Sequence, residues 1–229
     1  MSVAYVMLLS ILSAVTAAQT GGPVVDPDPN RFDREIGAFT QWDSRNAFPV
    51  DPILFVGSSS IRMWRTREAF PDLPVINRGF GGSHISDVIH FASRIVLPYK
   101  AKTIVFYAGD NDIAGGKSAQ RVLDDYRKFV AFARHDLPGV PIVFISIKPS
   151  GSRWSLWPEM KKANDLVKGF SATDARLFFA DLARPLLGSS GEPDPELFLD
   201  DRLHLNARGY AAWTKTLKPS IREALQARP

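Results

Sequence analysis

The stretch Ile53-Leu54-Phe55-Val56-Gly57 is an apolar run that leads directly into three serines at positions 58–60. Apolar residues occupy both sets of alternating positions, which is typical of a strand covered on both faces within a parallel sheet. Four more short runs of this kind follow, at 75–77 (VIN), 103–109 (TIVFYAG), 141–147 (PIVFISI) and 176–182 (RLFFADL). The sequence therefore predicts a parallel sheet of five strands.

Amphipathic segments separate and follow these runs. Between residues 118 and 135, apolar side chains at helical spacing form one stripe, with charged side chains opposite. The last segment repeats this pattern from 210 to 225, with Asn206 as a plausible N-cap and with Pro219 expected to kink or break the helix. Strands that alternate with helices through right-handed crossovers predict a doubly wound, three-layer α/β/α sandwich.

Length and composition limit the classes to which the chain can belong. With 229 residues, 45% apolar and 23% charged, it has the composition of a globular protein with one core, which we place at 51–229. Its 28 basic and 24 acidic residues are interspersed, so the net charge of +4 does not predict the clustered basic face of a nucleic-acid-binding protein. The absence of cysteine excludes disulfides, thiol nucleophiles and cysteine metal ligands.

The N-terminal segment has the pattern of a secretory signal peptide over residues 1–18. It is uncharged, and its apolar stretch ends at Thr16-Ala17-Ala18, which resembles a cleavage site. We therefore expect an exported protein, periplasmic or secreted, without a membrane span after signal removal. The usual basic residue ahead of the apolar stretch is missing, so a cytoplasmic protein with an apolar extension is the alternative. Residues 19–50 are interpreted as a lead-in, rich in Gly, Pro and Asp up to residue 30.

Polar segments follow three of the predicted strands. They are residues 57–60 (GSSS), 77–84 (NRGFGGSH) and 109–112 (GDND), and a fourth segment, 200–204 (DDRLH), precedes the last helix. In open α/β sheets, ligands bind beyond the carboxyl ends of the strands, near the point where the strand order reverses. We therefore expect the four segments to meet at one edge of the sheet.

These segments contain each group that acyl transfer needs. A serine on a strand-to-helix turn presents its hydroxyl and its backbone N–H, a glycine lets another N–H approach a substrate, and an asparagine amide adds a donor. Asp201 and His204 lie three residues apart, so the carboxylate can hold one imidazole nitrogen while the other faces the serine. The pattern is typical of serine-dependent acyl transfer.

The four segments also resemble, in order and at similar separations over residues 51–213, the sequence blocks of the SGNH hydrolases, the GDSL-like esterase and lipase superfamily. This resemblance implies a flavodoxin-like fold, with Ser59 as nucleophile, His204 as base and Asp201 as the carboxylate that orients the base. It implies an oxyanion hole made by the N–H groups of Ser59 and Gly82 and the amide of Asn111. One residue departs from the pattern: a serine stands at position 58, where the family has aspartate.

The resemblance implies a cofactor-free, metal-free enzyme that acts on small-molecule carboxylic esters. Short-chain acyl or acetyl esters, including those of carbohydrates or lipids, are the candidates. Two other classes remain open: a non-catalytic carbohydrate-binding member of the fold, and a metal-dependent phosphoesterase that uses Asp110, Asn111, Asp112, Asp201 and His204 as ligands. No spacing matches a known metal loop, and the sequence predicts neither the physiological ester nor the oligomeric state.

Neighbouring residues compete for the predicted roles. Ser58 and Ser60 flank the nucleophile, Asp200 stands beside Asp201, and His84 is a rival base that has no aspartate at comparable spacing. The glycines at 79–82 alternatively form only a turn. Asp110 and Asp112 are interpreted as loop or capping residues.

The segment after the fourth strand is a candidate for substrate contacts. Trp154 and Trp157 are predicted either to line an acyl or sugar site or to pack against the core. Arg78 and Arg153 are predicted either to contact a polar substrate or to be solvated at the surface.

Overall fold

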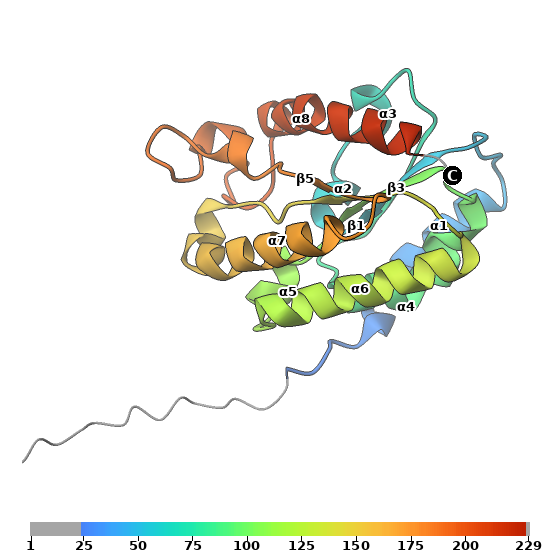
Figure 1. Cartoon of the computed structure of the whole chain (residues 1–229), viewed down its shortest axis with the longest axis horizontal. Coiled ribbons are helices and arrows are strands. Elements are labelled where there is room, and N and C mark those ends of the chain that lie inside the picture. Colours follow the sequence, from blue (N-terminus) through green and yellow to red (C-terminus); the bar gives the residue numbers. More distant parts are fainter. Residues whose placement is uncertain (1–23, 228–229) are drawn as a thin grey trace, which may run out of the picture.

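The computed structural model describes residues 24–227, so the signal peptide predicted at 1–18 lies outside the described residues. Five strands form one parallel sheet: β1 (Ile53–Gly57), β2 (Val75–Gly79), β3 (Thr103–Tyr107), β4 (Ile142–Ile145) and β5 (Leu177–Ala180). Their order across the sheet is β2-β1-β3-β4-β5, with every neighbouring pair parallel. Helices cover both faces (Figure 1), which confirms the predicted α/β/α sandwich.

One face of the sheet is covered by α1 (Asp33–Asp43), α4 (Ile85–Ile95), α6 (Ala119–Asp136) and α7 (Trp157–Ser171). Their buried side chains pack in one cluster with Leu54 and Val56 of β1 and with Phe106 of β3. Ser118 caps α6, because its hydroxyl accepts a hydrogen bond from the N–H of Arg121. Helix formation follows the apolar stripe read from the sequence.

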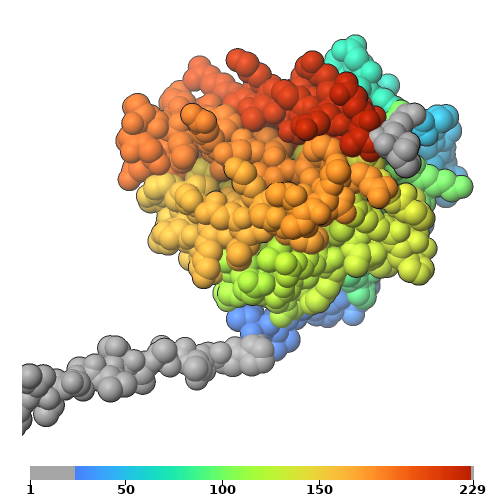
Figure 2. Space-filling model, in the orientation of Figure 1, coloured from blue at the N-terminus to red at the C-terminus, as the bar shows by residue number. Residues whose placement is uncertain are grey.

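The opposite face is covered by α2 (Ser59–Arg62), α3 (Thr66–Ala69) and the long α8 (Ala207–Gln226). Figure 2 shows α8, in red, beside the blue-green stretch that holds α3. Trp213 anchors α8: its side chain is fully buried, its ring lies 5.2 Å from the ring of Tyr107, and its Nε1–H donates to the carbonyl of Leu182 at 2.9 Å. Aromatic packing therefore fixes this helix on the sheet.

Helix α8 continues through Pro219 to Gln226, so the predicted break is wrong. Proline removes one backbone hydrogen bond, but Leu217 and Ile221 on either side of it are fully buried against the sheet. The burial of Leu217 and Ile221 therefore stabilises the helix on both sides of the proline.

Short elements complete the chain. They are α5 (Asp110–Ala114), η1 (Pro29–Phe32), η2 (Leu97–Tyr99), η3 (Gly151–Leu156), η4 (Arg184–Leu186) and η5 (Pro195–Leu197). Among residues 24–227, no helix is both long enough and apolar enough to cross a bilayer.

The predicted lead-in contains a helix that the sequence analysis did not identify. Ile36 of α1 is fully buried, and Asp43 at its end pairs with the guanidinium of Arg78. That guanidinium also lies over the rings of Trp42 and Tyr99. Helix α1 is therefore part of the folded domain. It is attached by the ion pair and cation–π contacts of Arg78, which no periodic sequence pattern indicates.

A buried cluster of charges joins the N-terminal segment to α5 and α6. The ammonium of Lys117 is fully buried and lies 2.8 Å from Asp112 Oδ1, 3.4 Å from Asp125 Oδ2 and 2.7 Å from Asp26 Oδ1. Such a group persists in the interior only because carboxylates surround it. Asp112 also accepts the N–H of Ile85, the first residue of α4, as expected of a capping residue, and its pairing with Lys117 is a second role that was not predicted.

His84 lies beside this cluster, at the start of α4. Its backbone N–H donates to Asp87 Oδ2 at 2.8 Å, and its Nδ1 lies 3.8 Å from Asp112 Oδ1. Burial, together with the charge of Lys117, lowers the pKa of His84 to about 4. The folded protein therefore favours the neutral imidazole.

We predict that Trp213→Ala lowers the free energy of unfolding by about 3–5 kcal/mol, since it creates a cavity and leaves the Leu182 carbonyl unpaired. Trp213→Phe keeps most of the apolar volume and loses the N–H donor, so its loss should be smaller, about 1–3 kcal/mol. Urea denaturation of both variants and the wild type measures this. Equal losses in the two variants would contradict the proposed importance of packing over the hydrogen bond.

We predict that His84 makes the protein less stable as the pH falls from about 6.5 to about 4, because the unfolded chain binds a proton over this range that the folded protein refuses. In His84→Gln the free energy of unfolding should therefore fall less between about pH 7 and about pH 4.5. Burial raises the pKa of Asp112 to about 6, which acts with the opposite sign below that pH, so the difference between wild type and variant is the quantity to compare. Parallel pH curves for the two proteins would contradict the assignment.

Candidate active site

Ser59 lies at the carboxyl end of β1, as the first residue of α2. The chain makes this turn at Gly57, whose φ is +142°, and a Cβ there would lie 1.8 Å from the carbonyl oxygen of Tyr107. Only glycine fits so close to β3. The turn leaves Ser59 8% exposed, while the side chains of Ser58 and Ser60 are fully buried.

His204 joins the serine to a carboxylate from the opposite end of the chain. Its Nε2 lies 3.0 Å from Ser59 Oγ, and its Nδ1 lies 2.6 Å from Asp201 Oδ2. Asp201 Oδ1 accepts the backbone N–H groups of Leu203 and His204, both at 2.9 Å. Although the partial burial of Asp201 acts to raise its pKa, these hydrogen bonds lower it to about 2, so the carboxylate is ionised at neutral pH.

The loop that carries His204 is held from both sides. The carbonyl of His204 accepts the N–H of Leu199 at 2.8 Å, and Phe198 forms a bridge with Leu205. Two residues after the histidine, Asn206 caps α8: its side chain accepts the N–H groups of Arg208 and Gly209, as the sequence predicted. The imidazole is therefore fixed by the first turn of a long, well-packed helix.

Two backbone N–H groups of the predicted segments have no partner among the described residues. Within residues 24–227, neither the N–H of Ser59 nor that of Gly82 donates a hydrogen bond to the protein. Gly82 has a φ of +72°, and a Cβ at this position would meet no atom within 4 Å. Open space at a glycine with positive φ lets a ligand approach the backbone closely.

Asn111 lies in α5, at the carboxyl end of β3. Its Nδ2 donates to the carbonyl of Ser83 at 3.1 Å, and its Oδ1 accepts a hydrogen bond from Arg153 Nη2 at 3.0 Å. Arg153 also lies 3.4 Å from Asp110, whose carboxylate accepts a hydrogen bond from the buried Lys148 at 3.0 Å. The structure thus places the four predicted segments at one edge, together with two cations of the β4–η3 region.

Asp110 is almost fully enclosed with these cations. Burial acts to raise the pKa of its carboxyl group, but the charges of Lys148 and Arg153 outweigh burial and hold the pKa below its usual value. From the sequence, we expected Asp110 to be a loop or capping residue and Arg153 to be a substrate contact or a surface residue. A signal for the buried ion pair was present in the sequence: Lys148 directly follows an apolar strand, where a buried acid must neutralise it.

Two of the predicted candidates, Arg78 and His84, have partners in other parts of the structure. Arg78 is buried and pairs with Asp43 of α1, so the expected solvated position is wrong and its contacts are structural. His84 faces the Lys117 cluster. Trp154 and Trp157 stack on each other with ring centroids 6.1 Å apart, next to Arg153, and Trp157 also packs against the core.

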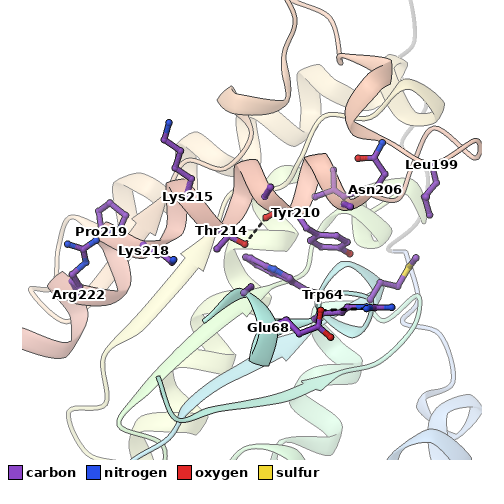
Figure 3. Close-up of a pocket in the computed structure, with 16 residues that line it drawn as sticks. Trp64, Glu68, Leu199, Asn206, Tyr210, Thr214, Lys215, Lys218, Pro219 and Arg222 are labelled. Atoms are coloured by element: carbon purple, nitrogen blue, oxygen red, sulfur yellow. Dashed lines mark hydrogen bonds and ion pairs between the residues drawn. The ribbon is translucent and has the colours of Figure 1, made fainter. Parts of the chain in front are cut away.

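A cavity of about 1100 Å³ lies beside this edge, between α8 and the α2–α3 segment. Figure 3 shows Trp64 and Glu68 on one wall and Tyr210, Lys215 and Lys218 on the other. Leu199 and Asn206, on either side of the His204 loop, line one end, but Ser59 and His204 themselves do not line it. The serine therefore does not line this cavity.

The arrangement at Ser59 is able to activate a hydroxyl. The imidazole nitrogen next to Ser59 can take its proton, and the ionised Asp201 stabilises the imidazolium that results. N–H donors on the other side of the serine suit a developing negative charge on oxygen. Among the described residues, no group of three His, Asp or Glu side chains is arranged to hold a metal ion.

Comparisons with known proteins show the family to which the chain belongs. The model of the GDSL-like lipase/acylhydrolase family matches residues 57–212, which include every segment of the site. No curated protein sequence matches the chain.

Solved structures of low sequence identity share the fold. A protein provisionally described as a platelet activating factor from Streptococcus pneumoniae aligns with a TM-score of 0.75 and 19% identity, over 82% of this chain and 92% of that one. A GDSL-like lipase from Bacteroides thetaiotaomicron aligns at 0.67 and 19%, over 86% and 98%. A catalytic variant of an acetylxylan esterase from Geobacillus stearothermophilus aligns at 0.61 and 14%, over 78% and 95%. With the family model covering most of the domain, the chain belongs to the GDSL-like lipase/acylhydrolase family of carboxylic ester hydrolases.

Proposed function

We propose that this protein hydrolyses short-chain acyl or acetyl esters through an acyl-enzyme formed on Ser59. The observation that carries the proposal is the His204 ring, which bridges Ser59 Oγ at 3.0 Å and Asp201 Oδ2 at 2.6 Å. A base in contact with both a hydroxyl and a carboxylate has the geometry that nucleophilic catalysis by serine requires.

The reaction has two steps. His204 takes the Ser59 proton while Oγ attacks the ester carbonyl, and the imidazolium then gives this proton to the departing alkoxide as the ester C–O bond breaks. Water attacks the acyl-enzyme with His204 again as base, which releases the acid and restores the serine. His204 keeps its Nδ1 proton throughout, because this N–H donates to the carboxylate of Asp201.

The oxyanion of each tetrahedral intermediate is bound, in this proposal, by the N–H groups of Ser59 and Gly82 and by the Asn111 amide. Both N–H groups have no protein partner within the described residues, so they are free to donate to substrate. Donors of this kind strengthen as negative charge develops, which is what lowers the barrier.

One feature supports a small acyl group. The large cavity beside the site is not lined by Ser59 or His204, so it does not provide a pocket for a long acyl chain that opens at the serine. The stacked pair Trp154–Trp157 supports a carbohydrate leaving group, because aromatic faces pack well against sugar rings. Export of the protein stays a prediction from residues 1–18.

We predict that Ser59→Ala reduces hydrolysis of p-nitrophenyl acetate to near background, because the nucleophile is lost. Ser58→Ala and Ser60→Ala are matched controls: both side chains are buried, and neither contacts His204. They should keep most of the activity. An acyl series from acetyl to octanoyl esters then tests chain length, and higher kcat/KM for the octanoyl ester would contradict the short-chain assignment.

We predict that Asp201→Asn lowers kcat by up to about 10⁴, because an amide no longer holds the proton on Nδ1. The adjacent carboxylate supplies the control, since Asp200→Asn removes the same charge one residue away. Steady-state kinetics on both variants compares them. A larger loss in Asp200→Asn would show that the wrong carboxylate has been assigned.

A further inference from the structure

The side-chain amide of Asn111 contributes to catalysis only in one of its two orientations. An asparagine amide has a donor end and an acceptor end of almost equal size, and rotation about its last bond exchanges them. With Nδ2 toward the oxyanion the amide donates, whereas with Oδ1 there it would repel the same negative charge. The energy difference between the two orientations must therefore come from contacts outside the substrate.

Two contacts set this orientation. Arg153 Nη2 donates to Asn111 Oδ1 at 3.0 Å, and Asn111 Nδ2 donates one hydrogen to the Ser83 carbonyl at 3.1 Å. A guanidinium has donors only, and a carbonyl oxygen accepts only, so a flipped amide would face a donor with a donor and an acceptor with an acceptor. Among residues 24–227, Nδ2 donates only to the Ser83 carbonyl, so its second hydrogen is left for the substrate.

The arginine is itself held by charge. Arg153 Nη1 lies 3.4 Å from Asp110 Oδ2, and this same oxygen accepts a hydrogen bond from Lys148 at 3.0 Å. Lys148 and Asp110 are almost fully buried, whereas the Arg153 side chain is 20% exposed. Asp110 Oδ1 also accepts the backbone N–H of Asn111 at 3.0 Å, so one carboxylate positions both the arginine and the residue that the arginine orients.

We propose that Arg153 is a positioning residue, which fixes the Asn111 amide with its N–H toward the oxyanion. This inference rests on the proposed function, because it assigns how one donor of that site is oriented. Lys148 and Arg153 share the carboxylate of Asp110, so these three side chains together carry a net positive charge, which further favours negative charge on the substrate oxygen. Arg153 lies outside the four sequence segments, in η3 after β4.

A double-mutant cycle on Arg153 and Asn111 tests the proposal. Arg153→Met should lower kcat for p-nitrophenyl acetate by roughly 10- to 100-fold with little change in KM, because the loss appears only where charge develops. Asn111→Ala should lower kcat by about 10²–10³. If Arg153 acts through the amide, adding Arg153→Met to Asn111→Ala should cost less than about threefold more, since coupled residues are not additive.

Further variants separate positioning from stability. Arg153→Lys keeps a positive donor without the planar fork, so it should recover part of the kcat lost in Arg153→Met. Arg184→Met, an exposed arginine of η4, is the control and should change neither kcat nor the melting temperature. Losses that multiply in the double variant, or an unchanged kcat in a folded Arg153→Met protein, would overturn the proposal while leaving the esterase assignment intact.

NMR tests the contact between Arg153 and Asn111 without relying on enzyme activity. The side-chain amide signals of Asn111 are assigned in ¹⁵N-labelled protein by their loss in Asn111→Ala, and they should shift and exchange faster with solvent in Arg153→Met. Unchanged signals would count against the inference whatever the kinetics show. If wild type has no esterase activity, the proposed function fails, but the amide signals still report whether Arg153 holds Asn111.

Discussion

The hydrogen bond between His204 and Ser59 joins residues 145 positions apart, and the rest of the structure makes that contact possible. The serine is presented by a turn that only glycine allows between β1 and β3, and the histidine is carried to it by a loop anchored on α8. Helix α8 packs through Trp213 on the same face of the sheet as α2. Ser59 and His204 are therefore both held by the same helical layer. The contact between Ser59 and His204 therefore depends on the whole domain, because its five strands and two helical layers hold two distant loops in place.

Buried charge is the second theme of this edge. Asp110 and Asp112 stand on either side of Asn111, and each is matched by a lysine from another part of the chain, Lys148 and Lys117 respectively. Ion pairs of this kind add little net stability, but breaking one of them leaves a charge without a partner, which resists any alternative arrangement. The two pairs therefore confine the short helix α5 and, with it, the amide between them. Neither pair contacts the serine; both hold the segment of Asn111, which is the proposed oxyanion donor.

Much of this could be predicted from the sequence, because the decisive signals were local. The apolar runs predicted five strands within one or two residues of those observed, and Asn206 marked the start of α8. Asp201 and His204 were identifiable from a spacing of three. The contacts that escaped prediction are long-range: Arg78 with Asp43, and Arg153 with Asn111. The partners of an arginine depend on how loops pack, which periodicity does not encode. The predicted break at Pro219 did not occur, because the burial of neighbouring residues outweighs the tendency of proline to end a helix.

Asn206 has one more implication. This residue ends the loop of the catalytic base and begins the helix that closes the sheet, so a single amide side chain couples the two. Fraying of the first turn of α8 would loosen His204 from one side, while the strands, the glycine turn and the proposed oxyanion donors stayed in place. If the imidazole then left Ser59, the protein would still bind an ester and yet be unable to cleave it, without melting of the core.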